Sequence, residues 1–357
     1  MAGTITRRTF GGVVLAAGAL LVSACGSNDA GASSAGGLET TTVSIGLGLD
    51  PGLAPQMVAI DKGFLKDEGF TDIKTSTYEA GALAGQALAA NEIDLWGPSN
   101  LPPINMRHNG VPIVVVGTAA SGWSEKLVVR DDATLEKPED LAKLKIGSLT
   151  GATSNIISSL ESLNGLAPNS IQAVNLTPPE QMVALANNEV QGIVIWNPWP
   201  AQFKLDHPDV PVSYAWEQDT SHFPWAQDQP MKASHSRMLF VLREDYLKDK
   251  PNAAAALMRA MYKAQAWLRD PANTDEAKSI FVKYTKYDPK VVDAIWSDYV
   301  FSPALDDAYV EDMKAYTDAL AKSGAIKDPQ DPLTYTDTQL LQAYDPTMVS
   351  VKGGWTP

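Results

Sequence analysis

The sequence predicts an α/β protein with two lobes, each a mainly parallel sheet flanked by helices. From residue 42 to residue 195, strand-like segments alternate with helical segments, and this alternation is typical of parallel sheets. A unit of helix, turn and strand in the first part of this stretch recurs in the second part. Strand-like segments at 126–130 and 238–242 flank the second copy. We therefore expect two chain crossings, with a hinge beneath a ligand cleft between the lobes.

The first lobe is expected to begin with an apolar strand at 43–47. A loop at Asp50-Pro51-Gly52 follows it, and a helix at 54–62 ends at Gly63. The loop separates a strand pattern from a helical pattern, as proline and glycine commonly do. The next expected elements, in chain order, are a strand at 73–77, a helix at 83–90, a strand at 93–96 and a strand at 112–116.

The second lobe is expected to begin its strand and helix pattern at residues 145–157. A short apolar strand there runs into a turn of small residues, and Thr153 or Ser154 can cap the helix that follows. Apolar residues at three- and four-residue spacings predict the later helices. The remaining expected elements are a strand at 171–176, a helix at 178–186, a strand at 192–195, and helices at 252–268, 274–284, 289–297 and 306–323.

An internal repeat supports the two lobes. Residues 87–98 and 184–198 share a helix end, an Asn-Glu turn, a strand and a closing Trp-x-Pro. Each copy also has an upstream Ile-Gly pair at a strand end, Ile45-Gly46 and Ile146-Gly147. We place the first part of lobe 1 at 43–128, lobe 2 at 129–237, and the second part of lobe 1, with the C-terminal helices, at 238–357.

The N-terminus has the pattern of an export signal. Arg7-Arg8 precede an apolar run at 11–22 that is too short to span a membrane as a helix. Cys25 follows Leu-Val-Ser-Ala and is the one cysteine of the chain, so no intramolecular disulfide can form. Its position resembles the bacterial lipobox, which predicts a signal peptide at 1–25 and a lipid on Cys25. The Gly-, Ser- and Ala-rich segment at 26–42 is typical of a flexible tether.

The composition indicates a folded acidic domain. Hydrophobic residues make up 45% of the 357 residues, and the formal net charge is −14. Removal of Arg7 and Arg8 with the signal peptide lowers the charge by two, to −16. An acidic surface repels phosphate backbones, so nucleic acid is not an expected partner. We expect an exported protein, held as a monomer at the outer face of the cytoplasmic membrane.

The sequence contains no recognisable catalytic or metal-binding motif. A Gly-x-Ser-x-Gly nucleophile elbow is absent, because Leu149 stands where the nucleophile would be. The phosphate loop Gly-Lys-Ser/Thr is also absent. We therefore expect neither an enzyme nor a bound cofactor or metal. The four histidines, none in a zinc-binding spacing, are His108, His207, His222 and His235.

The turn within residues 145–157 has features of an anion site. Gly147 and Gly151 permit a tight turn, and the N-terminus of the following helix would present backbone N–H groups to a small anion. A simple connecting turn remains the alternative, because a strand-Gly-helix pattern is weak when it occurs alone.

Ligands of α/β sheets bind beyond the carboxyl ends of the strands, so we place the candidate ligand residues there. Several tryptophans near the second lobe are candidates for the wall of an apolar or aromatic ligand, although they are as compatible with a core role. The candidate set is Asp50, Gly81, Ala82, Ser99, Asn100, Gly151, Ala152, Thr153, Ser154, Trp196, Asn197, Trp216 and Trp225.

Together these segments resemble a known family, the substrate-binding proteins of bacterial ABC importers that handle sulfonates, taurine, nitrate and thiamine precursors. The resemblance implies a two-lobed, two-crossover periplasmic-binding-protein fold of type II. It also implies an anion held between Gly81, Ser99-Asn100 and Thr153-Ser154, and delivery to a membrane permease driven by an ATPase. The matching segments are 55–69, 79–81, 87–94, 98–103, 140–147, 151–154, 178–180 and 196–198.

The chain departs from the family pattern at Asn197, where relatives often carry Asp, and in its extra tryptophans Trp199, Trp216 and Trp225. These departures favour a small organic anion, an aliphatic or aromatic sulfonate or carboxylate, over nitrate or taurine. Two other functions stay open. One is a ligand receptor for a membrane sensor, and the other is an enzyme similar to the pyrimidine synthases of this fold, which use cysteines that the chain lacks beyond Cys25.

Overall fold

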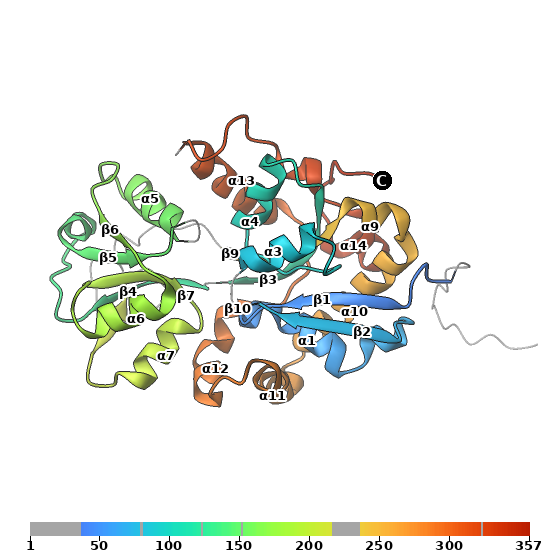
Figure 1. Ribbon diagram of the computed structural model, residues 1–357, viewed down its shortest axis with the longest axis horizontal. Coiled ribbons are helices and arrows are strands. Elements are labelled where there is room, and N and C mark those ends of the chain that lie inside the picture. The colour runs from blue at the N-terminus through green and yellow to red at the C-terminus, as the bar shows by residue number, and fades with distance from the viewer. Residues whose placement is uncertain (1–36, 79–80, 123, 151–152, 216–235, 323) are drawn as a thin grey trace, which may run out of the picture. The chain divides into compact units, whose positions relative to one another are not determined.

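The computed structural model describes residues 37–357, except 79–80, 123, 151–152, 216–235 and 323 (Figure 1). The expected signal peptide, Cys25 and most of the expected tether lie outside the described residues. In the part of the chain that is described, no helix is long and apolar enough to cross a membrane.

Two small sheets form the first lobe. Strands β1 (Thr42–Leu47) and β2 (Asp72–Thr77) pair in parallel. Strand β3 (Ile113–Gly122) lies between β10 (Tyr299–Val300) and β9 (Ser236–Arg243) and is antiparallel to both. The early helices of this lobe are η1 (Pro51–Leu53), α1 (Ala54–Asp61), α2 (Phe64–Asp67), α3 (Gly81–Ala89) and α4 (Leu101–His108).

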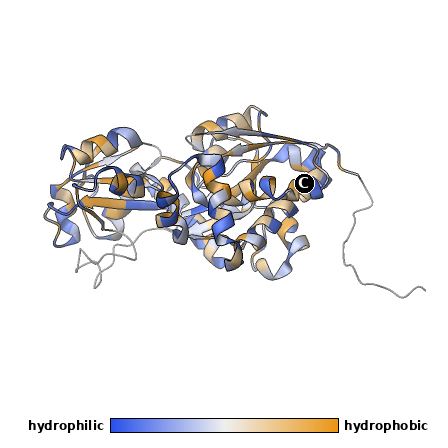
Figure 2. Ribbon diagram, turned by 90° about the horizontal axis from the view of Figure 1, so that it is seen from below, coloured by the Kyte–Doolittle hydropathy of each residue, from blue (hydrophilic) through white to orange (hydrophobic). Residues whose placement is uncertain are grey.

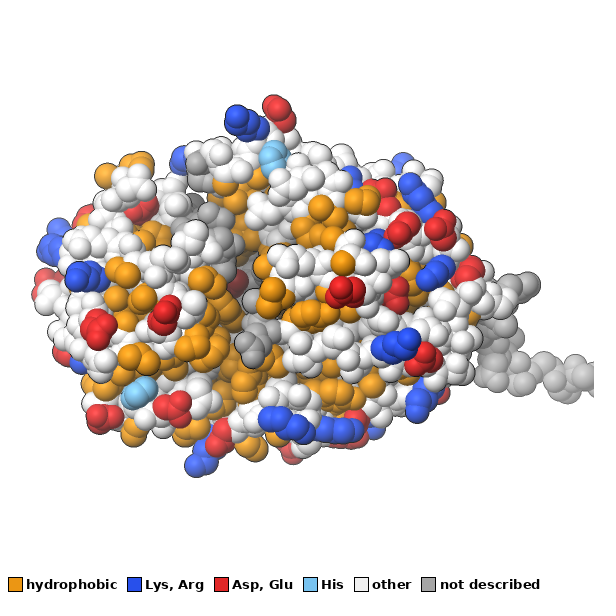
Figure 3. All heavy atoms as spheres, viewed as in Figure 1, with side chains coloured by type: hydrophobic (Ala, Val, Ile, Leu, Met, Phe, Trp, Pro, Cys, Tyr) orange, Lys and Arg blue, Asp and Glu red, His pale blue; other side chains and the backbone are white. Residues whose placement is uncertain are grey.

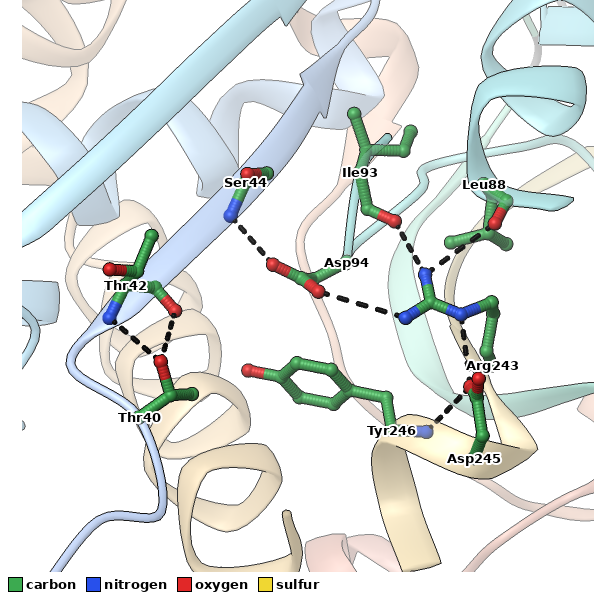
Figure 4. Close-up of polar contacts among 9 residues, drawn as sticks. All are labelled: Thr40, Thr42, Ser44, Leu88, Ile93, Asp94, Arg243, Asp245 and Tyr246. Carbon is green, nitrogen blue, oxygen red and sulfur yellow. Dashed lines mark hydrogen bonds and ion pairs between the residues drawn. The ribbon is translucent and has the colours of Figure 1, made fainter. Parts of the chain in front are cut away.

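The expected strand at 93–96 is wrong. Leu95 and Trp96 form only isolated bridges, to Ile45 and Val241. The backbone of this segment divides its hydrogen bonds between β1 on one side and Val241 on the other, so it forms no continuous ladder with either. At its start, Arg243 Nη1 donates to the Ile93 carbonyl at 2.8 Å (Figure 4). The Asp94 carboxylate in turn accepts from the backbone N–H of Ser44 at 2.8 Å (Figure 4).

The second lobe is built on a five-stranded sheet in the order β6-β5-β7-β4-β8. Strand β5 is parallel to β6 and β7, whereas β4 is antiparallel to β7 and β8. The expectation of mainly parallel sheets is therefore corrected to mixed sheets, because the strand that enters from the first lobe runs opposite to its neighbours. The bounds are β4 Glu125–Arg130, β5 Lys145–Ser148, β6 Gln172–Asn175, β7 Gly192–Trp196 and β8 Val212–Tyr214.

Helices cover both faces of this sheet. On one face, Leu127 and Val129 of β4 pack with α5 (Ser154–Leu163). On the other, the core includes residues of α6 (Pro178–Ala186) and α7 (Trp199–Asp206). Hydrophilic and hydrophobic residues alternate along the helices, as expected for elements with one buried side (Figure 2). The expected helix at 178–186 is confirmed to the residue.

The C-terminal part of the chain is largely helical and packs with the first lobe. One continuous core contains residues from Val43 to Ala120 and from Met238 to Trp355. The lobe boundaries at 128 and 237 stay a prediction.

The remaining helices follow in chain order. They are η2 Pro138–Lys143 in the second lobe, then α9 Glu244–Asp249, α10 Pro251–Leu268, η3 Pro271–Asn273, α11 Thr274–Thr285, α12 Pro289–Ile295, η4 Trp296–Asp298, α13 Asp307–Lys322, η5 Pro332–Tyr335, α14 Gln339–Tyr344 and η6 Pro346–Met348.

The strand-like segments 126–130 and 238–242 do not cross between sheets. The first lies within β4, in the five-stranded sheet, and the second within β9, in the first lobe. The first crossing is instead the short link between Gly122 at the end of β3 and Glu125 at the start of β4. The link between β8 and β9 falls mostly at 216–235, outside the described residues.

Candidate functional site

A group of polar side chains connects elements of both lobes, and we call Asp50, Ser124, Lys126, Asn197, Asp298 and Tyr299 the junction cluster. Asp50 caps η1, where its Oδ1 accepts from the backbone N–H of Gly52 at 2.7 Å. Its Oδ2 accepts from Ser124 Oγ at 2.7 Å and from the Tyr299 hydroxyl at 3.1 Å. The carboxylate therefore links the loop after β1 to the β3–β4 link and to β10.

Asn197 joins the end of β7 to the same cluster. Its backbone N–H donates to the Ser124 carbonyl at 2.9 Å, and its Nδ2 donates to Asp298 Oδ2 at 2.9 Å. Lys126 Nζ lies 3.1 Å from the same Asp298 oxygen, and the side chain of Lys126 is only 1% exposed. A buried cation is costly unless it is paired, and here the partner carboxylate of Asp298 is itself oriented by the Asn197 amide.

Glu125 lies beside the cluster and adds a second carboxyl. Its Oε1 accepts from Ser236 Oγ at 3.1 Å. Desolvation raises the pKa of Glu125 to about 7, and the negative charge of Asp50 adds to that rise. Desolvation also raises the pKa of Asp50 to about 6, against the lowering effect of its hydrogen bonds from Ser124, Gly52 and Tyr299. Two carboxyls that titrate near neutral pH thus lie at the junction.

The turn before α5 is held by its own side chains. The Thr153 hydroxyl accepts from the backbone N–H of Leu149 at 2.8 Å, and the N–H of Thr150 donates to Asn175 Oδ1 at 2.9 Å. Thr153 is buried, so its hydroxyl shapes the turn while the N-terminus of α5 offers backbone donors. Gly151 and Ala152 lie outside the described residues, as does the side chain of Ser154.

The first lobe supplies a second helix N-terminus. Gly81 and Ala82 begin α3 and are exposed, which leaves their backbone N–H groups accessible. Ser99, which is partly exposed, precedes Asn100 at the start of α4. Proline at 102 and 103 removes two N–H groups from that first turn. The start of α3 therefore offers more backbone N–H groups than the start of α4.

The side chain of Asn100 has a structural role. The amide is buried, its Oδ1 accepts from the backbone N–H of Arg237 at 2.6 Å, and its Nδ2 lies 3.4 Å from the sulfur of Met313. These contacts fasten α4 to β9 and α13. Asn100 as a whole is 1% exposed, and its ligand role expected from the sequence stays a prediction.

Aromatic residues lie along one side of the second lobe. Trp196, Trp199 and Tyr214 are half-buried and pack against the core beneath α6 and α7. Lys204 Nζ lies 3.8 Å from the ring centroid of Tyr214, within the range of a cation–π contact. Hydrophobic side chains also gather toward the middle of the face in Figure 3. Trp216 and Trp225 lie outside the described residues.

Sequence reasoning found Asp50 and Asn197 but missed the side chains that bind them. Tyr299 is 249 residues from Asp50, and Asp298 is 101 residues from Asn197, so no local spacing could reveal either contact. Ser124, Glu125 and Lys126 gave a weak signal, a polar run at the start of an otherwise apolar strand. Among the described residues, no group of three or more His, Cys, Asp or Glu side chains is placed to hold a metal ion.

Two curated proteins illustrate the sequence relationships of the chain. The nitrate/nitrite binding protein NrtA of Nostoc sp. is 25% identical over 275 residues, which are 69% of this chain and 58% of that protein. A putative aliphatic sulfonates-binding protein of Bacillus subtilis is 22% identical over 79% of this chain and 80% of that protein. The chain thus spans less than two thirds of NrtA and most of the sulfonate-binding relative.

Solved structures share the two-lobed fold. The periplasmic aliphatic sulphonate binding protein SsuA from Escherichia coli superposes with a TM-score of 0.68 at 17% identity, over 82% of this chain and 96% of that one. The desulfurization enzyme DSZB is also similar in fold, with a TM-score of 0.62 at 14% identity, over 85% of this chain and 98% of that one. A family model described as NMT1/THI5 like matches residues 50–274, from the Asp50 cap to the start of α11. The chain therefore belongs to the NMT1/THI5-like family.

Proposed function

We propose that the chain is a lipid-anchored solute-binding protein that captures a small organic anion outside the cell membrane and delivers it to an ABC importer. The observation that carries the proposal is the relationship to nitrate- and sulfonate-binding proteins, which covers the residues that form both lobes. The anchor rests on the lipobox-like position of Cys25. The partners would be a membrane permease and its ATPase.

The anion class is supported by two helix N-termini. Those of α3 and α5 offer backbone N–H groups, and such termini favour negative charge by their dipoles. Trp196 and Trp199 would contact an apolar or aromatic part of the ligand. A sulfonate or carboxylate with an organic body satisfies both features better than nitrate does.

Ligand capture would close the lobes about the β3–β4 link. A ligand closes such a clamp only by binding the closed state more tightly than the open state. Small-angle scattering of residues 37–357 with saturating ligand is expected to show a smaller radius of gyration than without it. An unchanged radius would contradict the clamp.

Thermal denaturation with a panel of anions tests the ligand class. Binding to the folded state raises stability by mass action, by about 2.7 kcal/mol at a concentration of ~100 times Kd. The panel contains alkane- and arylsulfonates, matching carboxylates, nitrate and thiamine precursors, with sugars and organic cations as controls. A rise in melting temperature with organic anions alone is expected. A response only to sugars or cations would refute the proposal.

A further inference from the structure

Glu125 lies at the sheet edge where the ligand is expected. Strand β7 is parallel to β5 and antiparallel to β4. The amino end of β4 therefore lies at the same edge as the carboxyl ends of β5 and β7, beyond which ligands bind in such sheets. Glu125 is the first residue of β4 and the register partner of Trp196, the last residue of β7.

Glu125 also lies on the α5 side of the sheet. Side chains alternate along a strand, so Glu125 shares a face with Leu127 and Val129. Those two residues pack against Ile156 and Leu160 of α5. The N-terminus of α5, a proposed anion site, follows the carboxyl end of β5 at that same edge. An anion bound there would lie at the same edge and on the same face of the sheet as the Glu125 carboxyl, two strand spacings or about 10 Å along the sheet.

Within the described part of the chain, the surroundings of Glu125 contain little positive charge to offset a bound anion. The described groups that face it are Asp50 at η1, Lys126 in its own strand, Ser236 of β9 and Tyr316 of α13. Lys126 forms an ion pair with Asp298. Arg237, which follows Ser236 in the chain, forms an ion pair with Asp312 at 2.6 Å. Of the charged groups that face Glu125, only Lys126 favours its ionised form, so the charge of Lys126 offsets the repulsion between an ionised Glu125 and a bound anion only in part.

We propose that Glu125 makes ligand binding proton-coupled, so that an anion enters the cleft together with one proton that neutralises the Glu125 carboxylate. The proton comes from the solvent and converts the carboxylate to a carboxylic acid, whose O–H can then donate to the anion. This inference rests on the proposed anion-binding function. It names Glu125 as the residue that selects for anions and makes their affinity depend on pH.

The hydrogen bonds explain why Glu125, and not Asp50, takes the proton. Asp50 accepts from three donors, Gly52, Ser124 and Tyr299, which favour its ionised form. Among the described residues, one side chain donates to Glu125, the hydroxyl of Ser236. The pKa of Glu125, about 7, also allows proton uptake near neutral pH, whereas Asp50, with a pKa of about 6, is already mostly ionised there.

Titration calorimetry tests the coupling with ethanesulfonate, benzenesulfonate and nitrate, which stay ionised throughout the pH range used. Binding enthalpies are compared in phosphate, imidazole and Tris, since a sulfonate buffer would compete for the site. Their dependence on the ionisation enthalpy of the buffer gives the number of protons taken up. We expect uptake approaching one proton at pH values above the pKa of Glu125, and a Kd that rises by up to about tenfold per pH unit there.

Two variants make the result specific. Glu125→Gln is expected to bind the same anion without proton uptake, with a Kd independent of pH and lower than that of the wild type at alkaline pH. Glu92→Gln removes the same charge from an exposed turn and should retain the wild-type uptake. A merely structural role of Glu125 would change affinity but not proton number.

The outcomes separate the two proposals. Binding of any probe with no proton uptake, or uptake that persists in Glu125→Gln, overturns the coupling and leaves anion binding intact. Taurine, which carries both a sulfonate and an ammonium group, gives a further check. If the wild type binds taurine more tightly than ethanesulfonate and Glu125→Gln does not, the ionised Glu125 carboxylate pairs with the ammonium group. That result would also overturn the coupling. Failure of the whole anion panel at every pH would refute the proposed function itself.

Discussion

The side-chain amide of Asn197 donates to the carboxylate of Asp298 at 2.9 Å and so ties the end of β7 to η4. The same carboxylate receives Lys126 from β4. One acidic side chain of the first lobe thus holds two elements of the second-lobe sheet. The tie lies beside the β3–β4 link, about which we propose that the lobes close.

Replacing Asn197 by Asp should weaken this tie. The new carboxylate would be buried beside Asp298, and both the lost hydrogen bond and the repulsion reduce stability, by about 1–3 kcal/mol at neutral pH. Protonation of either carboxylate would remove the repulsion, so the loss should be smaller in mild acid than at pH 8. Urea unfolding at both pH values measures it.

The matched control is Asn187→Asp, which places the same charge on an exposed helix end. It should change the free energy of unfolding much less, with little dependence on pH. Equal stability of Asn197→Asp and the wild type at pH 8 would contradict the role given to the Asn197–Asp298 contact.

Gly122 should tolerate no side chain. A Cβ atom at this position would lie 1.9 Å from the backbone carbonyl oxygen of Asp298, and a backbone atom cannot move aside cheaply. We expect Gly122→Ala to lower stability by about 3 kcal/mol or more, since overpacking against backbone exceeds the usual cost of an extra methyl group. The yield of soluble protein and its melting temperature measure the effect.

Gly81→Ala provides the comparison. Apart from its chain neighbours and the backbone of its own helix, no described heavy atom lies within 4 Å of a Cβ at Gly81, and the residue begins α3. Stability should stay equal or rise by up to about 1 kcal/mol, because alanine favours helix more than glycine does. A Gly122→Ala variant that melts like Gly81→Ala would show that β10 does not pack against the β3–β4 link as described.

The sequence predicted best the elements whose signals are local. The helix at 178–186 begins at Pro178 after Thr177, whose N–H donates to Glu180 at 2.8 Å, a start signal contained within four residues. The strand expected at 93–96 failed because the backbone bonds of this segment are divided between β1 and β9, which are distant in the sequence, and form no continuous ladder with either. The direction of β4 relative to β7 depends on where the chain passes from the first lobe into the second. The composition of a strand does not specify that point.

The candidate site was predictable only in part, because its contacts join residues that are distant in the sequence. Asp50 and Asn197 stand at strand ends, where a general rule directs attention. Their partners Tyr299 and Asp298 come from the helical C-terminal region, where the pattern indicated only a helix end. The role of Glu125 depends on strand register, which the sequence does not specify without its partner strand.

The internal repeat extends to backbone conformation and can be tested there. Asn91 and Asn188 both have positive φ, 64° and 60°. In each copy the next residue closes the helix with the same hydrogen bond, from Glu92 to Ala87 at 2.9 Å and from Glu189 to Ala184 at 2.8 Å. Asparagine tolerates this left-handed conformation better than most residues.

Alanine at either position should therefore cost about 1 kcal/mol relative to glycine, and the two sites should respond alike. The variants are Asn91→Ala and Asn91→Gly, with Asn188→Ala and Asn188→Gly as the second pair. Urea unfolding gives the differences. A penalty at one site only would mean that the two turns, though alike in sequence, differ in the strain that they carry.

Glu125 should also make the stability of the unliganded protein depend on pH. Its folded-state pKa of about 7 is raised from the ordinary value of 4.5, chiefly by desolvation. As pH rises, the unfolded chain releases this proton before the folded protein does. The favourable contribution of the carboxyl is therefore complete below about pH 4.5 and is lost by about pH 7, a change of the order of 1–3 kcal/mol.

The difference between the wild type and Glu125→Gln isolates this contribution, because carboxyls with lowered pKa values, such as Asp132 and Asp140, are common to both proteins and cancel. Melting temperatures from pH 4 to pH 8 without ligand should diverge in favour of the variant as pH rises. Parallel curves would mean that the Glu125 carboxyl is well solvated. A carboxyl of that kind would be ionised at neutral pH and would have no reason to gain a proton when an anion binds, so the ligand-free melting curves also test the physical basis of proton-coupled binding.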